Sequence, residues 1–398
     1  MSVMRNILKV FLAVLTPTVL VFWTIIRILT LHSKTHYYHL NECLFSTYMR
    51  VFLFFFEYLT LSKLFIYGDT EFHKEGRKRA LYISNHLSTV DWFICSMLLA
   101  RQGGIGRTRF VLHKNLKYIP VFGFYLAQDS FVFVDRSNFQ AQKAVDVLNE
   151  IKDVQSDVWM IIYPEGKRFN PEHLDVIEKS AEFARNNGTK PLRHHLTPRY
   201  KGLKLLLDNF RDYVDVIYDV SVVYADADGR PLDHRIRVPQ LLNWMDSTRS
   251  LHIHVTRIPI HSVPVGDNQL YKWLCERFHI KDQFVENLQN HFYPSDGHLL
   301  CKADGETNHL SSTITNGGLH PASDDMQGSI MKAMPKEMHK EAAVLQPLRL
   351  IDLLPSLLLF YGVTIYWLVG FGWYGPLSYL AVSVLGSAAG MIYVHYFV

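Results

Sequence analysis

The chain has 398 residues, of which 48% are hydrophobic and 20% charged, and its formal net charge is +4. This length allows at least one large buried core. So small a positive charge argues against nucleic acid as a partner but fits an anionic membrane surface or an anionic substrate. The four cysteines lie far apart and form no C-x-x-C pair, which argues against a disulfide framework or a zinc site and indicates reduced thiols facing the cytosol.

The N-terminal 66 residues predict a membrane-anchoring region. Residues 10–26 are apolar and lie between Lys9 and Arg27. Bulky residues follow instead of a small-residue cleavage site, so we interpret this segment as a retained anchor. Residues 44–66 are also apolar but carry Arg50, Glu57 and Lys63, a pattern that favours an interfacial or partly inserted helix.

Residues 67–295 have the pattern of an α/β domain, in which short apolar runs alternate with amphipathic segments. The predicted strands are 79–85, 107–113, 130–136, 159–166, 216–224 and 251–258, and the predicted helices are 90–102, 138–154, 173–188 and 201–213. This alternation predicts a layered α/β fold with a mixed or largely parallel sheet.

The stretch Y82-I-S-N-H-L-S-T-V-D-W-F93 places His86 five positions before Asp91. One interpretation is structural: Ser88-x-x-Asp91 is a helix-start signal, with Ser88 as the cap. The other is catalytic: a carboxylate orients an imidazole that accepts a proton. Positions five apart lie on different faces of a helix, so His86 must sit in the loop before a helix that begins near Ser88. Both interpretations can hold together.

Cationic side chains follow the ends of several predicted strands. Glu165, Gly166, Lys167 and Arg168 follow the run 158–162 and form a glycine turn suited to an anionic group. A P-loop is excluded because its glycine spacing is absent. Each cluster, taken alone, is also compatible with a solvated turn.

Two further cationic positions complete this set. Arg136 follows the predicted strand 130–136 directly after Asp135, and Arg199 lies in a loop beside Pro198. Surface charge is again the simpler explanation for each one alone, and their joint occurrence favours a site.

A pair of histidines, His252 and His254, lies on one face of a predicted strand. They could form half of a metal site. The alternative, which we favour, is the polar side of a half-buried strand.

The C-terminal part divides into a polar linker and an apolar tail. Residues 296–349 are polar and predict a flexible linker. Residues 353–398 contain no Asp, Glu, Lys or Arg, and they predict two membrane spans, about 351–369 and 377–397, joined by a Gly/Pro turn. Basic residues before the first span favour a cytosolic side for the linker. We therefore expect domains at 1–66, 67–295, 296–349 and 350–398.

The order His-x4-Asp, F-V-F-V-D-R, P-E-G-K-R and T-P-R resembles the glycerolipid acyltransferase family, with its NHx4D and EGTR blocks. Within that family, the chain looks similar to 1-acylglycerol-3-phosphate acyltransferases of the epsilon type over about residues 50–290. There are two departures: Ser130 stands where the second block usually has Gly, and Lys167 where EGTR has Thr.

The resemblance implies acyl transfer from acyl-CoA to the free sn-2 hydroxyl of a lysophospholipid, with 1-acylglycerol-3-phosphate (lysophosphatidic acid) as the leading candidate. It implies His86 as the general base and Asp91 as the group that orients it. The implied phosphate-binding residues are Glu165, Gly166, Arg168, Arg136, Lys167 and Arg199. No metal or bound cofactor is expected.

Two alternatives stay open at this point. One is an acyltransferase for another lysophospholipid, of the lysocardiolipin or lysophosphatidylinositol type; the other is a lipid-binding membrane scaffold without turnover. We expect an integral protein of the endoplasmic reticulum with a cytosolic catalytic domain, and mitochondria or the nuclear envelope are alternative locations.

Overall fold

A computed structural model describes residues 14–76, 78–119, 122–135, 141–154, 157–226, 229–232, 249–292 and 343–397. Its strands form one mixed eight-stranded sheet in the order β4-β3-β5-β2-β6-β7-β1-β8. The strands are β1 (Leu61–Gly68), β2 (Ala80–Ser84), β3 (Thr108–His113), β4 (Val132–Val134), β5 (Trp159–Ile162), β6 (Val216–Ala225), β7 (Arg249–Pro259) and β8 (Ala343–Val344). Neighbours from β4 to β6 pair in parallel, while β7 is antiparallel to β6, β1 is parallel to β7, and β8 is antiparallel to β1.

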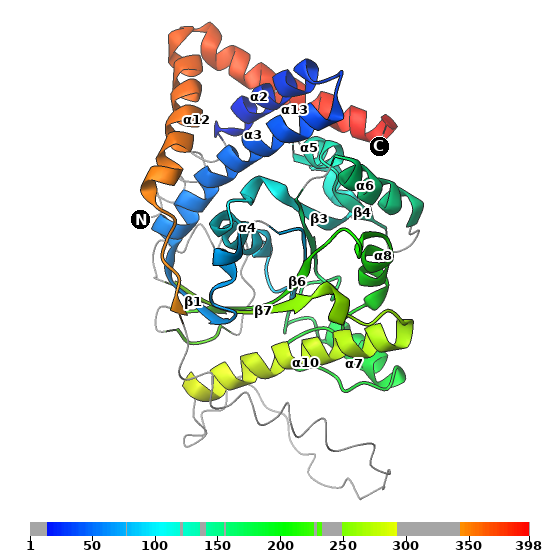
Figure 1. Cartoon of the computed structure of the whole chain (residues 1–398). Coiled ribbons are helices and arrows are strands. Elements are labelled where there is room, and N and C mark those ends of the chain that lie inside the picture. The colour runs from blue at the N-terminus through cyan, green and yellow to red at the C-terminus, as the bar shows by residue number, and fades with distance from the viewer. Residues whose placement is uncertain are drawn as a thin grey trace, which may run out of the picture.

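Helices cover both faces of this sheet. The helices are α2 (Thr16–Leu29), α3 (Lys34–Phe54), α4 (Asp91–Arg101), α5 (Phe122–Gln128), α6 (Ala141–Asp153), α7 (Leu174–Asn186), α8 (Tyr200–Phe210), α10 (Asp267–Phe292), α12 (Leu350–Gly370) and α13 (Tyr374–Phe397). In Figure 1, α4 lies inside the curve of the sheet, whereas α8 and α10 lie outside it. Two buried clusters match this division, one packed around α3 and α4 and the other around α6, α8 and α10. The predicted layered α/β fold is confirmed, and so are the six strands and four helices predicted within it.

The expectation of one helix across residues 44–66 is wrong in its second half. Helix α3 continues as a π-helical turn at Phe55–Thr60, and β1 follows. Alternation explains the strand, because Leu64 and Ile66 are buried in the core while Lys63 is exposed. Since β1 and β8 belong to the sheet, the sheet takes in residues on both sides of the predicted boundaries at 66 and 296.

The one acidic side chain of this segment, Glu57, is satisfied by protein groups. Glu57 is buried and forms a bidentate ion pair with Arg101 of α4, at 2.8 and 3.2 Å. Its carboxylate also accepts a hydrogen bond from the backbone N–H of Leu348, just before α12. The pair therefore ties the start of the first C-terminal apolar helix to the α/β domain.

The two predicted C-terminal apolar helices are confirmed, and α12 and α13 are each long and apolar enough to cross a membrane. Helix α13 begins three residues earlier than expected because Pro376 lies in its first turn, where proline needs no hydrogen-bond donor. Trp373, in the turn between the two helices, is 93% exposed. Helix α2 is shorter and packs with α3 and α12, where the Thr18 and Thr364 hydroxyls lie 2.7 Å apart.

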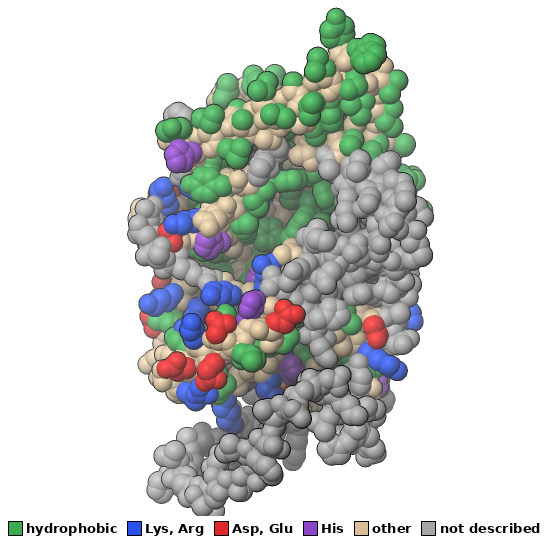
Figure 2. Space-filling model, turned by 180° about the vertical axis from the view of Figure 1, so that it is seen from behind, with side chains coloured by type: hydrophobic (Ala, Val, Ile, Leu, Met, Phe, Trp, Pro, Cys, Tyr) green, Lys and Arg blue, Asp and Glu red, His purple; other side chains and the backbone are tan. Residues whose placement is uncertain are grey.

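The surface has an apolar part and a charged part. Seen from behind, hydrophobic side chains cover the helices at the top, and charged side chains gather on the lower part (Figure 2). Between these parts the surface is hollowed, and hydrophobic side chains line the hollow. Most of the predicted linker, residues 296–342, lies outside the described residues.

Candidate active site

Asn85 directly follows strand β2 and fixes the position of the residue after it. Its side-chain amide donates to the carbonyl of Val222 on β6 at 2.9 Å and accepts from the N–H of Val222 at 2.8 Å. The side chain thus replaces the next peptide of the parallel ladder between β2 and β6. His86 is thereby placed directly beyond the carboxyl edge of the sheet, where parallel α/β sheets carry their sites.

His86 and Asp91 are in direct contact. His86 Nδ1 lies 2.7 Å from Asp91 Oδ2, and the same oxygen accepts from the backbone N–H groups of Leu87 and Ser88 at 2.9 and 3.0 Å. The other oxygen accepts from the hydroxyl of Tyr224 on β6 at 2.7 Å. Asp91 is buried, so its carboxylate is held by four donors in a single orientation.

The helix-start interpretation of this stretch is corrected in its details. Helix α4 begins at Asp91, and its cap, Val90, makes no side-chain capping bond. The Ser88 hydroxyl accepts from the N–H of Val90 within the preceding turn. Asp91 turns back toward the loop, as the catalytic interpretation requires.

This contact sets the chemistry of the imidazole. A carboxylate accepts only, so Nδ1 carries the hydrogen and Nε2 is left as the acceptor. The His86 side chain is 25% exposed. Its ring stacks on Tyr163 with centroids 4.5 Å apart, which limits its rotation. The arrangement leaves Nε2 of a partly exposed imidazole as the ring atom that can accept a proton.

Glu165 uses its carboxylate to hold backbone groups of the protein, and its phosphate-binding role stays a prediction. Glu165 is buried, and its two oxygens accept from the backbone N–H groups of His86 and Leu196, at 2.7 and 2.8 Å. Burial raises the pKa of this carboxyl to about 8, although the two N–H donors act in the opposite direction. Glu165 therefore positions the His86 loop, and its raised pKa limits repulsion of a nearby anion.

The turn that follows Glu165 is bonded to the same loop. The N–H of Gly166 donates to the carbonyl of Tyr163, and Gly166 has a φ of 68°, in the left-handed region that favours glycine. The N–H of Phe169 donates to the carbonyl of His86 at 2.9 Å. Lys167 is exposed and Arg168 half-buried. The structure thus brings the predicted cationic turn next to His86.

The remaining predicted cations are placed differently. The backbone N–H of Arg199 donates to the carbonyl of Pro164, but its guanidinium lies 3.3 Å above the ring of Phe183 on α7. Arg136 lies outside the described residues. Nearby, Ser130 has a φ of 51°, which explains why the second block of the family usually has glycine there.

His252 is engaged by protein groups at both ring nitrogens. Nδ1 lies 2.7 Å from the hydroxyl of Tyr67, and Nε2 lies 2.9 Å from the carbonyl oxygen of Gly229. Burial lowers the pKa of His252 to about 4. Among the residues that the structure describes, no cluster of three metal-ligating side chains includes it or His254.

The sequence did not point to a second histidine–aspartate pair. His195 Nδ1 lies 2.9 Å from Oδ1 of Asp282 on α10, and the His195 side chain is fully buried. The signals for this pair were weak, because 87 residues separate its members and His195 lies in a loop. Tyr224 was also missed, although its position in the predicted strand 216–224 could have indicated that it faces α4.

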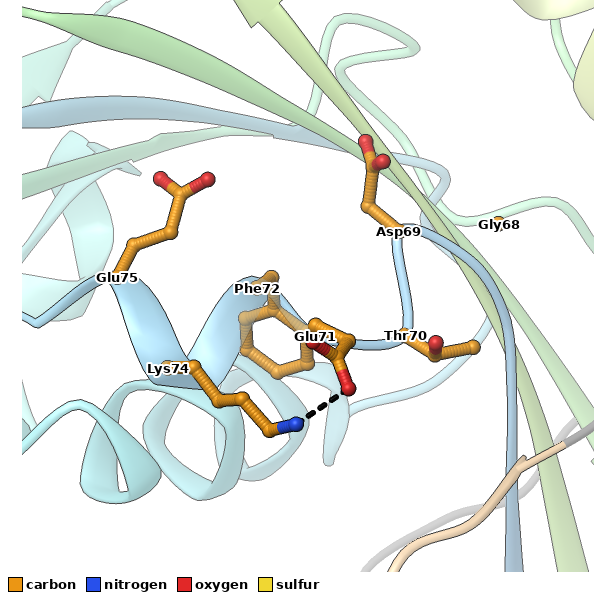
Figure 3. A pocket seen from close by; sticks show the side chains of 7 residues that line it. All are labelled: Gly68, Asp69, Thr70, Glu71, Phe72, Lys74 and Glu75. Atoms are coloured by element: carbon orange, nitrogen blue, oxygen red, sulfur yellow. Dashed lines mark hydrogen bonds and ion pairs between the residues drawn. The ribbon is translucent and has the colours of Figure 1, made fainter.

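A shallow pocket at the end of β1 lies apart from these residues. It is lined by Gly68, Asp69, Thr70, Glu71, Phe72, Lys74 and Glu75 (Figure 3). Lys74 is joined to Glu71, and Arg257 pairs with Glu75 at 2.8 Å. With three carboxylates around it, this pocket disfavours a phosphate, and it contains none of the predicted site residues.

Comparison with known proteins gives a consistent picture. Residues 63–220 match the family described as Acyltransferase, and residues 240–299 match the one described as Acyltransferase C-terminus. The chain is 35% identical over 272 residues to 1-acyl-sn-glycerol-3-phosphate acyltransferase epsilon of Mus musculus, covering 68% of this chain and 73% of the relative. It is 28% identical over 304 residues to the probable 1-acyl-sn-glycerol-3-phosphate acyltransferase 5 of Arabidopsis thaliana, covering 74% and 76%. Identity to the delta enzyme of Homo sapiens is 28% over 216 residues, 54% of each chain.

Proposed function

The chain belongs to the acyltransferase family that includes the 1-acyl-sn-glycerol-3-phosphate acyltransferases, and from this premise we propose its reaction. It transfers an acyl chain from acyl-CoA to the sn-2 hydroxyl of 1-acylglycerol-3-phosphate and so forms phosphatidic acid. The observation that carries this proposal is the contact between His86 and Asp91 beside the cationic turn.

His86 supplies the general base. The lipid hydroxyl attacks the thioester carbonyl as Nε2 of His86 takes its proton. Asp91 holds the tautomer with hydrogen on Nδ1 and stabilises the imidazolium that forms. The tetrahedral intermediate then expels the CoA thiolate, which takes the proton from Nε2. The products are the ester and free CoA, and the reaction needs neither a metal ion nor a bound cofactor.

The turn after β5 supplies the phosphate site. Gly166 presents backbone, while Arg168 and Lys167 present positive charge beside His86. Arg offers paired N–H donors to phosphate oxygens, and Lys adds a point charge. Arg136 is proposed as an additional partner on the strength of the family motif alone. Arg199 contributes through its backbone contact with this turn, since its guanidinium stacks on Phe183.

The apolar helices bring this site to its lipid substrate. Helices α12 and α13 can cross a membrane, and an apolar hollow lies between the helices and the charged part of the domain (Figure 2). We place the protein in the endoplasmic reticulum membrane with its catalytic domain on the cytosolic side, as the basic flank of α12 and the unpaired cysteines favour. Protease treatment of sealed microsomes should digest the 67–295 domain; its protection would contradict this orientation.

The acceptor is tested with a panel of lysophospholipids. The purified protein would receive oleoyl-CoA and lysophosphatidic acid, lysophosphatidylinositol or lysocardiolipin, and the diacyl product would be followed. We expect lysophosphatidic acid to react with the highest kcat/KM. Faster turnover of another lysolipid would identify that lipid as the acceptor in place of lysophosphatidic acid. No turnover of any lysolipid would favour the scaffold alternative.

The phosphate site is tested with Arg168→Gln. Losing a charged hydrogen bond of about 1.5–3 kcal/mol should raise the KM for lysophosphatidic acid by about 10- to 100-fold and leave the KM for oleoyl-CoA unchanged. The matched control is Lys179→Gln on the exposed surface of α7. Equal KM values in the two variants would contradict the assignment.

A further inference from the structure

Helix α10 is fixed to the sheet on the face opposite to α4 (Figure 1). Asp219 of β6 contacts Arg277 Nε and Lys281 Nζ of α10, each at 2.6 Å. Lys281 is buried and also donates to the carbonyl of Val220 at 2.6 Å. Two cations on one buried carboxylate, with a further bond to the strand, fix how α10 is turned about its axis and how far it lies from the sheet. The next residue along α10 is Asp282.

Asp282 uses its carboxylate to hold a loop. Its oxygens accept from the backbone N–H groups of Arg193 and His194, both at 2.8 Å. His195 Nδ1 adds a third contact at 2.9 Å. Burial alone would raise the pKa of Asp282, but these three donors outweigh it and lower that pKa, which keeps the carboxylate ionised. The segment 193–195 is therefore fixed to α10 by charge-assisted bonds.

The same loop reaches the catalytic residues within one further residue. The N–H of Leu196 donates to Glu165 Oε2, and Glu165 Oε1 accepts from the N–H of His86. Asp282 is thus joined to the backbone of His86 through two carboxylates and one short loop. Both carboxylates bond backbone N–H groups along this route. The series of bonds therefore fixes the position of His86 and does not carry charge to it.

We infer that Asp282 and His195 are positioning residues for His86. This inference rests on the proposed function, since it takes His86 as the base. His195 does not act on the substrate, because its side chain is fully buried. Its Nε2 has no hydrogen-bond partner among the residues that the structure describes, so the side chain hydrogen-bonds α10 through Nδ1, while its ring packs edge-on against Phe278 of the same helix. The loop bonds thereby set where Glu165 holds the N–H of His86.

The first test compares two neighbouring carboxylates of α10. Asp282→Asn removes an acceptor of the loop backbone, whereas Glu286→Gln removes a surface contact with the exposed side chain of Arg193. A small displacement of a base lowers kcat strongly, so Asp282→Asn should lose about 10- to 100-fold in kcat. KM for both substrates should stay within about twofold, and Glu286→Gln should match wild type.

The second test separates positioning from folding. His195→Asn keeps an N–H donor near the place of Nδ1, whereas His195→Ala does not. We expect His195→Asn to retain kcat within about threefold and His195→Ala to lose about tenfold. Thermal midpoints in detergent would be recorded for all variants, and the Asn/Ala pair decides the matter if Asp282→Asn fails to fold.

The outcomes are distinguishable. The inference is overturned if Asp282→Asn keeps the wild-type kcat, or if His195→Asn and His195→Ala lose equal activity. If His86→Ala itself keeps full activity, the proposed function fails instead, whatever the α10 variants do.

Discussion

The two histidine–aspartate pairs have nearly the same geometry and opposite surroundings. His86 and Asp91 are 2.7 Å apart and His195 and Asp282 are 2.9 Å apart, in both cases through Nδ1 and a carboxylate oxygen. The His86 side chain is 25% exposed, whereas that of His195 is fully buried. A base needs a substrate within reach of Nε2, so only His86 can act on one. Under the proposed function, the exposure of the imidazole, more than the pair itself, distinguishes a base from a positioning residue.

The largest effect is expected at the carboxylate of the accessible pair. Asp91→Asn adds an N–H group where His86 and two backbone donors need an acceptor, and it no longer holds the base in its tautomer. We expect kcat to fall by about 10²- to 10⁴-fold. Steady-state release of free CoA measures this. A kcat for Asp91→Asn within a few-fold of wild type would contradict a catalytic role for the His86–Asp91 pair.

A smaller loss is expected at the carboxylate that links them. Glu165→Gln leaves one acceptor for two N–H donors, so kcat should fall by about 10- to 100-fold through displacement of His86. The folded state favours the protonated form of Glu165, so wild type should lose stability as the pH rises from about 4.5 to about 8. Thermal midpoints across this range should show a shallower decline in the variant. A parallel decline in both would contradict the role of Glu165.

A still smaller loss is expected from the tyrosine that supports only the accessible pair. Tyr224→Phe removes the hydroxyl that donates to Asp91 Oδ1 but leaves the other three donors in place. One net hydrogen bond of about 1 kcal/mol corresponds to about a fivefold decrease in kcat. The matched control is Tyr218→Phe on the same strand, whose hydroxyl accepts from Gln102 instead. Equal losses in the two variants would count against the assignment.

The buried pair should also affect how the stability of the protein depends on pH. Burial lowers the pKa of His195 below its unfolded value, so the folded state favours the neutral form. The stabilisation is present above pH 6.5 and is lost as the pH falls through that value toward the lower folded pKa. The thermal midpoint of wild type should therefore fall further between pH 7 and pH 5 than that of His195→Asn. Other buried histidines are common to both proteins and cancel, so equal losses would contradict the prediction.

The smallest effect is expected at a position that contacts neither pair. Ser130 has a left-handed backbone, so Ser130→Gly should relieve strain and stabilise the fold by up to about 1 kcal/mol. The thermal midpoint in detergent should rise slightly, with kcat unchanged. A lower midpoint would show that the side chain of Ser130 contributes more than its backbone strain costs.

The sequence predicted those features whose signal is local. Alternating apolar runs predicted the six strands from β2 to β7, and an uncharged run predicted α12 and α13. His86 and Asp91 could be predicted as a pair because they lie five positions apart, with a helix start beside them. Their contact through Nδ1 agrees with that prediction, while their catalytic role stays a proposal.

The rest depends on contacts between distant segments. Asp282 meets His195 only because α10 folds back across the sheet, and β8 pairs with β1 through residues as far apart as Ile66 and Ala343, 277 positions along the chain. Glu165 was expected to bind phosphate because it precedes two cations. In the structure, its buried carboxylate is used by two backbone N–H groups, which no local pattern indicates.

The most direct test compares wild type with His86→Ala, both purified in detergent and supplied with oleoyl-CoA and lysophosphatidic acid. His261→Ala, at an exposed histidine, is the control. We predict phosphatidic acid and free CoA from wild type and the control, and a rate at least about 10²-fold lower from His86→Ala. Equal rates in wild type and His86→Ala would contradict the assignment of His86 as the base.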